Sequence, residues 1–146
     1  MEYAGFWKRF AAALIDGLII LVGSAILGAV IGAIIGLSLA TSGSDTETIG
    51  IIAGAVGNVI GLIFNWLYFT LQESSSKQAT FGKRALSIKV TNAQGERISF
   101  GRANGRYWAK VISTLTLLIG YFMAGFTQKK QALHDKMSDC LVINDQ

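Results

Sequence analysis

Two long apolar runs, neither of which contains a charged residue, dominate the pattern of hydrophobic and polar positions. They cover residues 17–39 and 49–71, which is 23 residues each. A helix needs about 20 predominantly apolar residues to cross the hydrocarbon core of a bilayer, which is roughly 30 Å thick. The pattern therefore predicts two transmembrane helices, over about residues 10–39 and 49–71, in an all-α integral membrane protein with one domain over 1–146.

A third apolar run, at residues 111–126, is shorter than a simple crossing requires. It contains Gly120 and Gly125 and follows a polar stretch that begins near residue 101. The segment 101–126 is either a short or tilted span, or a re-entrant or interfacial pair of helices that is broken around Gly120.

The placement of charges bears on which side of the membrane each segment lies. All 13 Lys and Arg residues lie outside the loop 40–48, which contains two acidic residues. Cytoplasmic loops collect Lys and Arg, so we expect this loop to be extracytoplasmic and the N-terminus, the central segment 72–104 and the tail 127–146 to be cytoplasmic. A third full crossing would put the basic tail outside, and we therefore prefer a segment 101–126 that dips and returns.

The central segment contains a pattern typical of strands. Leu86, Ile88 and Val90 alternate with polar residues, and a turn follows in which Gly95 can adopt a positive φ. The pattern predicts a β-hairpin over residues 85–100. Because an isolated hairpin is marginally stable, we consider residues 140–143 as a third strand, which requires a cytoplasmic tail.

Composition agrees with a membrane protein and argues against several other classes. Apolar residues make up 51% and charged residues 15% of the chain, whereas soluble domains carry about 25% charged residues. One Cys and one His give neither a disulfide framework nor a zinc site. The net charge of +4 fits a membrane surface better than nucleic acid. We find no phosphate-binding glycine loop, so we expect no enzyme, cofactor or metal.

Polar residues inside the predicted spans are candidates for function, because a charge in a bilayer is expensive. Asp16 lies near the cytoplasmic end of the first span, and Arg9 precedes it by about two turns on one face. A direct ion pair between Arg9 and Asp16 is one alternative, and Arg84, Arg102 and Arg106 are competing partners for Asp16. Asn65 lies at a depth similar to that of Asp16, so we expect the two to approach. Asn58 lies two turns deeper than Asn65 on the same face, and both are either ligands or interhelical hydrogen-bonding groups.

Basic residues recur every fourth position after residue 101. Arg102, Arg106 and Lys110 would share one face of a helix that Ser99 caps, with aromatic residues beside them. This face, together with Arg84, is either a set of anchors reaching the headgroups or a specific site for anionic lipid or another anion.

Small residues recur at a spacing that lets helix backbones approach closely. The chain has 17 glycines, more than two spans need for packing against each other, so we expect a homo-oligomer. The candidate packing residues are Gly28, Gly32, Gly36, Gly50, Gly54, Gly57 and Gly61.

Three stretches of the chain together resemble the RDD family of membrane proteins, which is named for one arginine and two aspartates. They are residues 3–10 followed by Asp16, residues 81–102, and residues 132–135 leading into 141–143. The resemblance covers nearly the whole chain and implies that Arg9, Asp16 and Asp135 are the signature residues. Arg9 then bridges both acids, or Asp135 pairs with Arg84 or Arg102. Many relatives have a proline in the third apolar region, and this chain has none.

The resemblance also implies a bacterial-type inner-membrane protein with a suspected transport role. We expect an oligomeric transporter or ion-coupled exchanger for an ion or small molecule, with Asp16 as the titrating carboxylate and Arg9 as its partner. One alternative is a structural or accessory module in which the three signature residues form an assembly latch. A further alternative is binding or handling of anionic lipid.

Overall fold

A computed structural model describes residues 1–116 and 119–145. Contacts divide the chain into two compact units, which we treat separately. The hairpin unit consists of Leu18–Trp66, and the terminal unit consists of Met1–Gly17 together with Leu67–Gln146.

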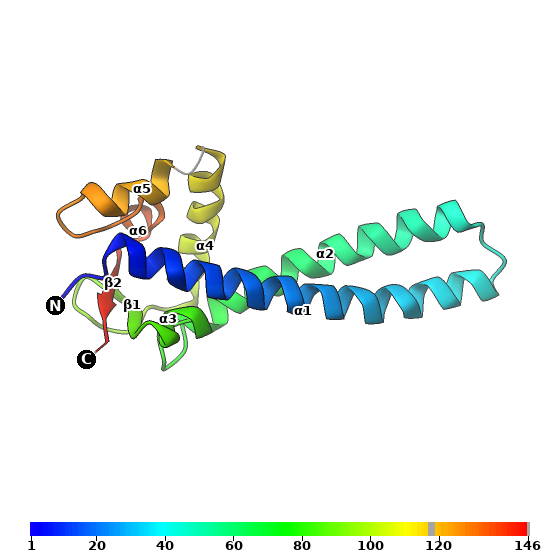
Figure 1. Ribbon diagram of the computed structural model, residues 1–146, viewed down its shortest axis with the longest axis horizontal. Helices are drawn as coiled ribbons and strands as arrows, with labels where there is room; N and C mark the ends of the chain where they lie inside the picture. The colour runs from blue at the N-terminus through cyan, green and yellow to red at the C-terminus, as the bar shows by residue number, and fades with distance from the viewer. Residues whose placement is uncertain (117–118, 146) are drawn as a thin grey trace. The chain divides into compact units, whose positions relative to one another are not determined.

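The hairpin unit contains most of the two longest helices, α1 (Phe6–Thr41) and α2 (Thr46–Glu73), which the loop 42–45 joins (Figure 1). Both helices are long and apolar enough to cross a membrane. Large apolar side chains such as Leu21 and Leu62 are two-thirds exposed, as lipid-facing residues are. The two predicted spans are confirmed. Helix α1 begins at Phe6, well before its apolar run, and α2 extends a few residues beyond its run at both ends.

The loop between the spans is fixed by its own side chains. The Asp45 carboxylate accepts hydrogen bonds from the Thr48 amide (2.8 Å) and the Thr48 hydroxyl (2.7 Å), which caps the start of α2. Gly43 has a φ of +81°, which favours glycine at this turn. Asp45, one of the two acidic residues of this loop, therefore also marks where the loop ends and α2 begins.

Glycine packs the hairpin unit at a position that the sequence pattern did not single out. A Cβ on Gly23 would lie 2.8 Å from the far end of the Phe64 ring, so a larger residue there would require that ring to shift. One on Gly36 would meet Ile49 at an ordinary 3.8 Å. The remaining predicted packing glycines have no atom of the described chain within 4 Å of that position: Gly28, Gly32, Gly50, Gly54, Gly57 and Gly61. The spacing therefore does not describe the packing within this single chain.

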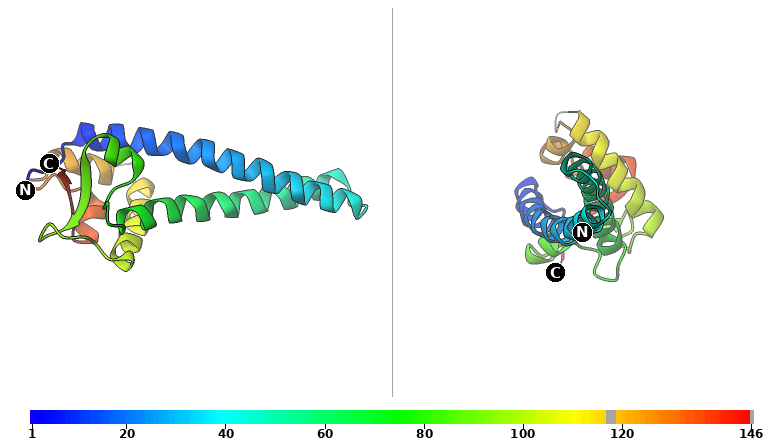
Figure 2. Two further views of the ribbon diagram at one scale, coloured as in Figure 1. Left: turned by 90° about the horizontal axis from the view of Figure 1, so that it is seen from below. Right: turned by 90° about the vertical axis from the view of Figure 1, so that its right-hand side faces the viewer.

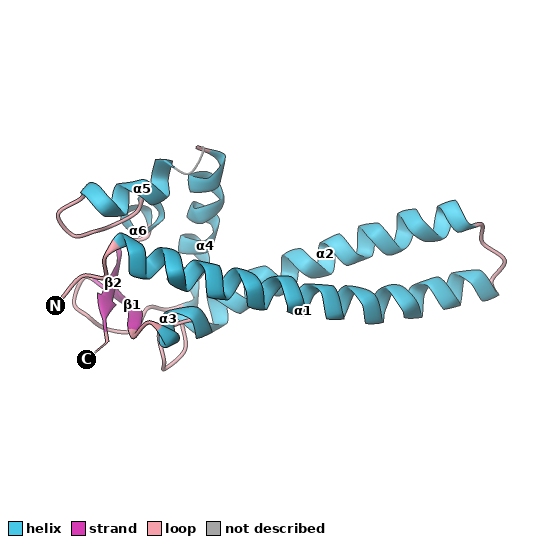
Figure 3. Ribbon diagram, in the orientation of Figure 1, coloured by secondary structure: helices cyan, strands magenta, loops and turns pink. Residues whose placement is uncertain are grey.

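The terminal unit is built on a two-stranded antiparallel sheet of β1 (Ile88–Asn92) and β2 (Cys140–Asn144), drawn in magenta in Figure 3. Residues 2–4 lie along the other edge of β2, where the Ala4 amide donates to the Val142 carbonyl at 2.9 Å. Consequently the two ends of the chain lie close together (Figure 2). A sheet element in a mainly helical protein was predicted and is confirmed.

The predicted pairing of the hairpin 85–100 is wrong. The turn forms, since the Asn92 amide donates to the Glu96 carbonyl at 2.9 Å, but residues 96–99 do not continue as a strand. Ser99 instead caps a helix by accepting the Arg102 amide at 3.2 Å, and Ile98 is buried in the core. Because a helix starts at residue 100, residues 96–99 do not form the second strand of the hairpin. The strand that pairs with β1 is β2, which the sequence suggested only as a third strand.

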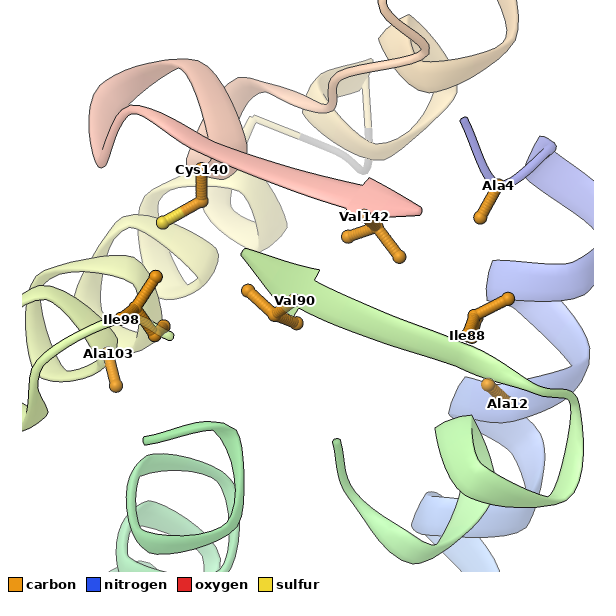
Figure 4. Packing of buried hydrophobic residues seen from close by; sticks show 8 residues of the cluster. All are labelled: Ala4, Ala12, Ile88, Val90, Ile98, Ala103, Cys140 and Val142. Carbon is orange, nitrogen blue, oxygen red and sulfur yellow. The ribbon is translucent and has the colours of Figure 1, made fainter. Parts of the chain in front are cut away.

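A small core holds segments from the beginning, middle and end of the chain together. Figure 4 shows Val90 of β1 facing Val142 of β2, with Ala4 and Ile98 to either side. All four are at most 1% exposed. The terminal unit therefore forms only when all three parts of the chain meet.

The third apolar segment consists of two helices, α4 (Phe100–Leu115) and α5 (Ile119–Phe126), whose axes differ by 104°. Gly120 is the second residue of α5, and a Cβ there would lie 2.8 Å from the Ser113 hydroxyl oxygen. The predicted break near Gly120 is confirmed, since α4 ends at Leu115 and α5 begins at Ile119; residues 117–118 lie outside the described residues. Two short helices complete the unit, α3 (Phe81–Ala85) and α6 (Leu133–Met137).

Candidate functional site

The signature residues lie in two different side-chain clusters of the terminal unit. In the first cluster, Asp16 is 1% exposed and accepts three hydrogen bonds. Its Oδ1 accepts from the Tyr68 hydroxyl (2.7 Å) and the Gly82 amide (2.8 Å), and its Oδ2 accepts from the Thr80 hydroxyl (2.5 Å). Among the described residues no Lys or Arg nitrogen lies within 4.0 Å of this carboxylate. Neutral donors therefore hold Asp16.

Local backbone geometry brings residues 80–82 against α1. A Cβ on Gly82 would lie 2.2 Å from the Ala12 carbonyl oxygen and 2.8 Å from Asp16 Cγ, so only glycine fits. Thr80 serves two purposes, because its hydroxyl donates to Asp16 and accepts the Lys83 amide to cap α3. This close approach joins the first span to the segment that follows the second.

The second cluster is a buried ionic network of Arg9, Lys83, Glu73, Arg106 and Asp135. Arg9 Nη2 lies 2.6 Å from Asp135 Oδ2, and Arg106 Nη2 lies 2.8 Å from Asp135 Oδ1. Arg106 also donates through Nη1 to Glu73 Oε2 at 2.5 Å. The Lys83 ammonium pairs with the other oxygen of Glu73. Charges of opposite sign thus alternate from α1 to α3.

Burial makes the network sensitive to the loss of any member. Both carboxylates are at most 2% exposed, as is Arg106. Burial alone would raise the pKa of Asp135, but Arg106 and Arg9 outweigh it and hold that pKa below its usual range. Burial lowers the pKa of Lys83, and Glu73 opposes the shift. Removing one partner from such a buried pair typically costs about 3–5 kcal/mol, because the other charge is left uncompensated.

The short helix α6 aims Asp135 into this network. Asp135 Oδ2 accepts the amide of Ala132 at 3.0 Å, which caps the helix and fixes the carboxylate. Arg9 lies in the second turn of α1, and Arg106 lies on the buried face of α4 with Ala103 and Ala109. Asp135 therefore connects the C-terminal tail to both helices.

The predicted basic face of α4 is not one exposed stripe. Arg102 is exposed, Arg106 is buried in the ionic network, and Lys110 Nζ lies 3.6 Å from the centre of the Phe69 ring. The three residues do recur on one helix at four-residue spacing. Arg106 cannot reach lipid headgroups, however, because its guanidinium group is paired with Glu73 and Asp135. Arg84, the other predicted anion contact, is exposed beside the Phe81 ring at 5.6 Å.

Arg9 and Asp135 of the predicted signature cluster are in direct contact, while Asp16 has separate partners. Neither Arg84 nor Arg102 is the cation that meets Asp135; Arg106 takes that place. Asn58 and Asn65 belong to the hairpin unit, and their role as ligands and the approach of Asn65 to Asp16 stay predictions.

Sequence reasoning missed Glu73, Lys83, Tyr68, Thr80 and Gly82 as site residues. Glu73 carried a usable signal, because it is the first charged residue after the second apolar run and precedes the cations of the central segment. The Phe81–Arg84 stretch was used for the family resemblance without assigning Gly82 a contact. Tyr68 and Thr80 gave no signal by themselves, since their importance depends on where Asp16 lies.

The chain was compared with known proteins. The sequence model of the RDD family matches residues 3–139. A Bacillus subtilis protein titled "Uncharacterized protein YxaI" is 38% identical over 138 residues, which cover 90% of this chain and 91% of the relative. Another from the same organism, titled "Uncharacterized membrane protein YteJ", is 29% identical over 98% of this chain and 82% of its own length. No solved structure matches the chain significantly.

Proposed function

The chain belongs to the RDD family of membrane proteins, and we propose that it is a non-catalytic structural or accessory membrane module in which the signature residues form an assembly latch. By assembly latch we mean the contacts of Arg9 with Asp135 and of Asp16 with residues 80–82. They would hold the tail and the central segment against the start of α1. One observation carries the proposal: each signature side chain contacts another segment of the same chain, and both aspartates are fully buried there.

The donor set around Asp16 favours this proposal over proton transfer. The Asp16 carboxylate accepts hydrogen bonds from two hydroxyls and one backbone amide, so three of its roughly four lone-pair sites are taken by neutral groups of the same chain. These bonds reach residues 64 and 66 positions further along the chain, so the arrangement favours an aspartate that holds residues 80–82 against α1.

We also propose that both ends of the chain lie in the cytoplasm of a bacterial-type cell. The argument counts membrane crossings. Residues 2–4, which precede α1, and β1, which follows α2, both hydrogen-bond to β2, so all three lie on one side. Two crossings, by α1 and α2, return the chain to the side where it started. The segment α4–α5 must then begin and end on that side, so it dips into the membrane, and the 104° bend between its helices fits this path. Exposed Leu115 and Phe126 suit contact with lipid.

The latch is tested by Asp135→Asn, which keeps the shape of the side chain and removes its charge. We expect the protein to insert but to lose its folded tail, measured as faster proteolysis of residues 127–145 in membranes. Asp139→Asn is the matched control, since Asp139 is exposed on the same tail. Equal protease resistance of both variants would contradict the latch.

A second candidate function is transport by a homo-oligomer, which the carboxylate of Asp16 within the apolar α1 favours. Asn58 and Asn65 would be additional ligands. The test is sodium or proton flux into proteoliposomes under an imposed gradient. The latch alone predicts no flux above that of empty liposomes. Flux that disappears in an assembled Asp16→Asn variant would establish transport instead.

Binding of anionic lipid is a third proposal, now restricted to cations that the ionic network leaves exposed. Arg84 and Arg102 meet this condition, whereas Arg106 does not. We expect Arg84→Gln combined with Arg102→Gln to weaken binding to phosphatidylglycerol vesicles and to leave the unfolding temperature unchanged.

A further inference from the structure

The chain has one histidine, His134, and it lies in the C-terminal part of the latch beside Asp135. The residue is 3% exposed. Its Nε2 lies 3.4 Å from Asp135 Oδ1, and its Nδ1 is buried without a hydrogen-bond partner in the described part of the chain. The ring packs 5.0 Å from the ring of Tyr121. The site therefore suits an uncharged imidazole, which has one donor and one acceptor nitrogen.

Cations outnumber anions around this imidazole. Arg9 of α1 and both Arg106 and Lys110 of α4 act on it. The opposing acid is Asp135, which two arginines already share. Glu73 of α2 is likewise taken by Arg106 and Lys83. Helix α5 contributes the uncharged hydroxyl of Tyr121, and β2 contributes no charged side chain.

A proton on His134 would thus add a further positive charge to a buried site in which cations already outnumber carboxylates. Burial lowers the pKa of His134 well below its usual 6.5, and the neighbouring arginines and Lys110 add to the shift against the effect of Asp135. The ring is neutral while the tail is docked, and it becomes protonated readily only when the tail is in water.

We propose that His134 makes the latch sensitive to acid, so that proton uptake at its ring releases α6 and β2 from the rest of the terminal unit. This inference rests on the proposed role of the Arg9–Asp135 pair as a latch. Protonation favours the released tail, because only there can the imidazolium be hydrated.

The sign and size of the effect follow from linkage. The docked state binds fewer protons than the released state below pH 6.5, so docking is strongest at higher pH and weakens as the pH falls. The open fraction grows about tenfold per pH unit below 6.5 until the pKa of the docked ring is reached. Between pH 7.5 and 5.5 the expected rise is about tenfold, a window in which exposed carboxylates do not titrate.

Cys140 provides a natural reporter for this release. It is the single cysteine, it begins β2, and it is fully buried. The full chain in nanodiscs is labelled with 4,4′-dithiodipyridine from pH 7.5 to 5.5, and each rate is divided by that of the denatured protein at the same pH. We expect the normalised rate to rise about tenfold in the wild type and in Asp139→Asn, and to stay constant in His134→Gln.

The outcomes separate the two proposals. A flat wild-type profile, or an equal rise in His134→Gln, overturns the acid-sensitive role of His134. If Asp135→Asn labels fast at pH 7.5, the latch stands whatever the wild-type profile shows. If Asp135→Asn protects Cys140 as well as the wild type does, the latch itself is wrong. Should His134→Gln label fast at every pH, His134→Asn replaces it, and the wild-type profile still decides.

Discussion

Asp16 and Asp135 are both signature aspartates and both fully buried, yet the protein holds them in different ways. Two hydroxyls and a backbone amide surround Asp16, whereas two guanidinium groups surround Asp135. Neutral donors satisfy a carboxylate without bringing a second charge into the interior. A cationic site binds more strongly, but it leaves charges uncompensated when one member is lost. The comparison teaches that the two aspartates should respond differently to the same substitution.

The largest expected effect is at the centre of the ionic network. Arg106→Gln leaves two buried carboxylates with one cation each, so we expect a loss of about 3–5 kcal/mol in the free energy of unfolding. Chemical unfolding in detergent micelles measures this loss. The matched control is Arg102→Gln, one turn earlier on the same helix and exposed, for which we expect less than about 0.5 kcal/mol. Equal effects of the two variants would mean that the network does not stabilise the fold.

A second prediction concerns the backbone approach that supports the Asp16 cluster. Gly82→Ala places a methyl group into the Ala12 carbonyl and Asp16, so we expect a loss of about 1–3 kcal/mol or more. Gly105→Ala is the control, because apart from the backbone of α4 itself no atom of the described residues lies within 4 Å of its Cβ position. That variant should be neutral or more stable by about 0.5–1 kcal/mol, as a glycine inside a helix usually is when replaced. Unfolding curves of both variants test this difference in sign.

The smallest effect is expected for Asp16→Asn, and this prediction sharpens the comparison of the two aspartates. The amide oxygen still accepts from Tyr68 and Gly82, and the Thr80 hydroxyl turns to accept from the new NH2 group. We expect a loss of about 1–1.5 kcal/mol, against a larger loss for Asp135→Asn. The measurement is the pair of unfolding free energies under identical conditions. A reversed order would contradict the division into neutral and ionic sites.

The sequence predicts a helix or strand correctly where a single local hydrophobic pattern determines it. Uncharged runs predict α1 and α2, and alternation predicts β1, because both signals are local. The partner of β1 was not decided locally. Residues 98–100 carry apolar alternation and residues 140–143 are a continuous apolar run, so both could form a strand. The Ser99 cap settles the competition by starting a helix.

The site was less accessible, because its contacts join residues far apart in the chain. Glu73 with Arg106 and Asp16 with Thr80 are 33 and 64 positions apart, so no spacing rule relates them. The four-residue repeat of Arg102, Arg106 and Lys110 gave the right helical face. It could not tell which member is buried, since that depends on acids from α2 and α6. Asp135 entered the candidate site through the family resemblance and not through its local pattern.

The central claim is that the tail lies beside the N-terminus on one side of the membrane, where the latch can form. Crosslinking in intact membranes tests it most directly, with Tyr3→Cys and Ile143→Cys introduced into a Cys140→Ser chain. Residues 3 and 143 face each other across the β2 edge, within the range that a disulfide can bridge. We predict an intramolecular disulfide on mild oxidation and none when Gly43→Cys, in the loop between the two spans, replaces Tyr3→Cys. Failure of the first pair to crosslink, with Ile143→Cys labelled only from outside the cell, would contradict the account.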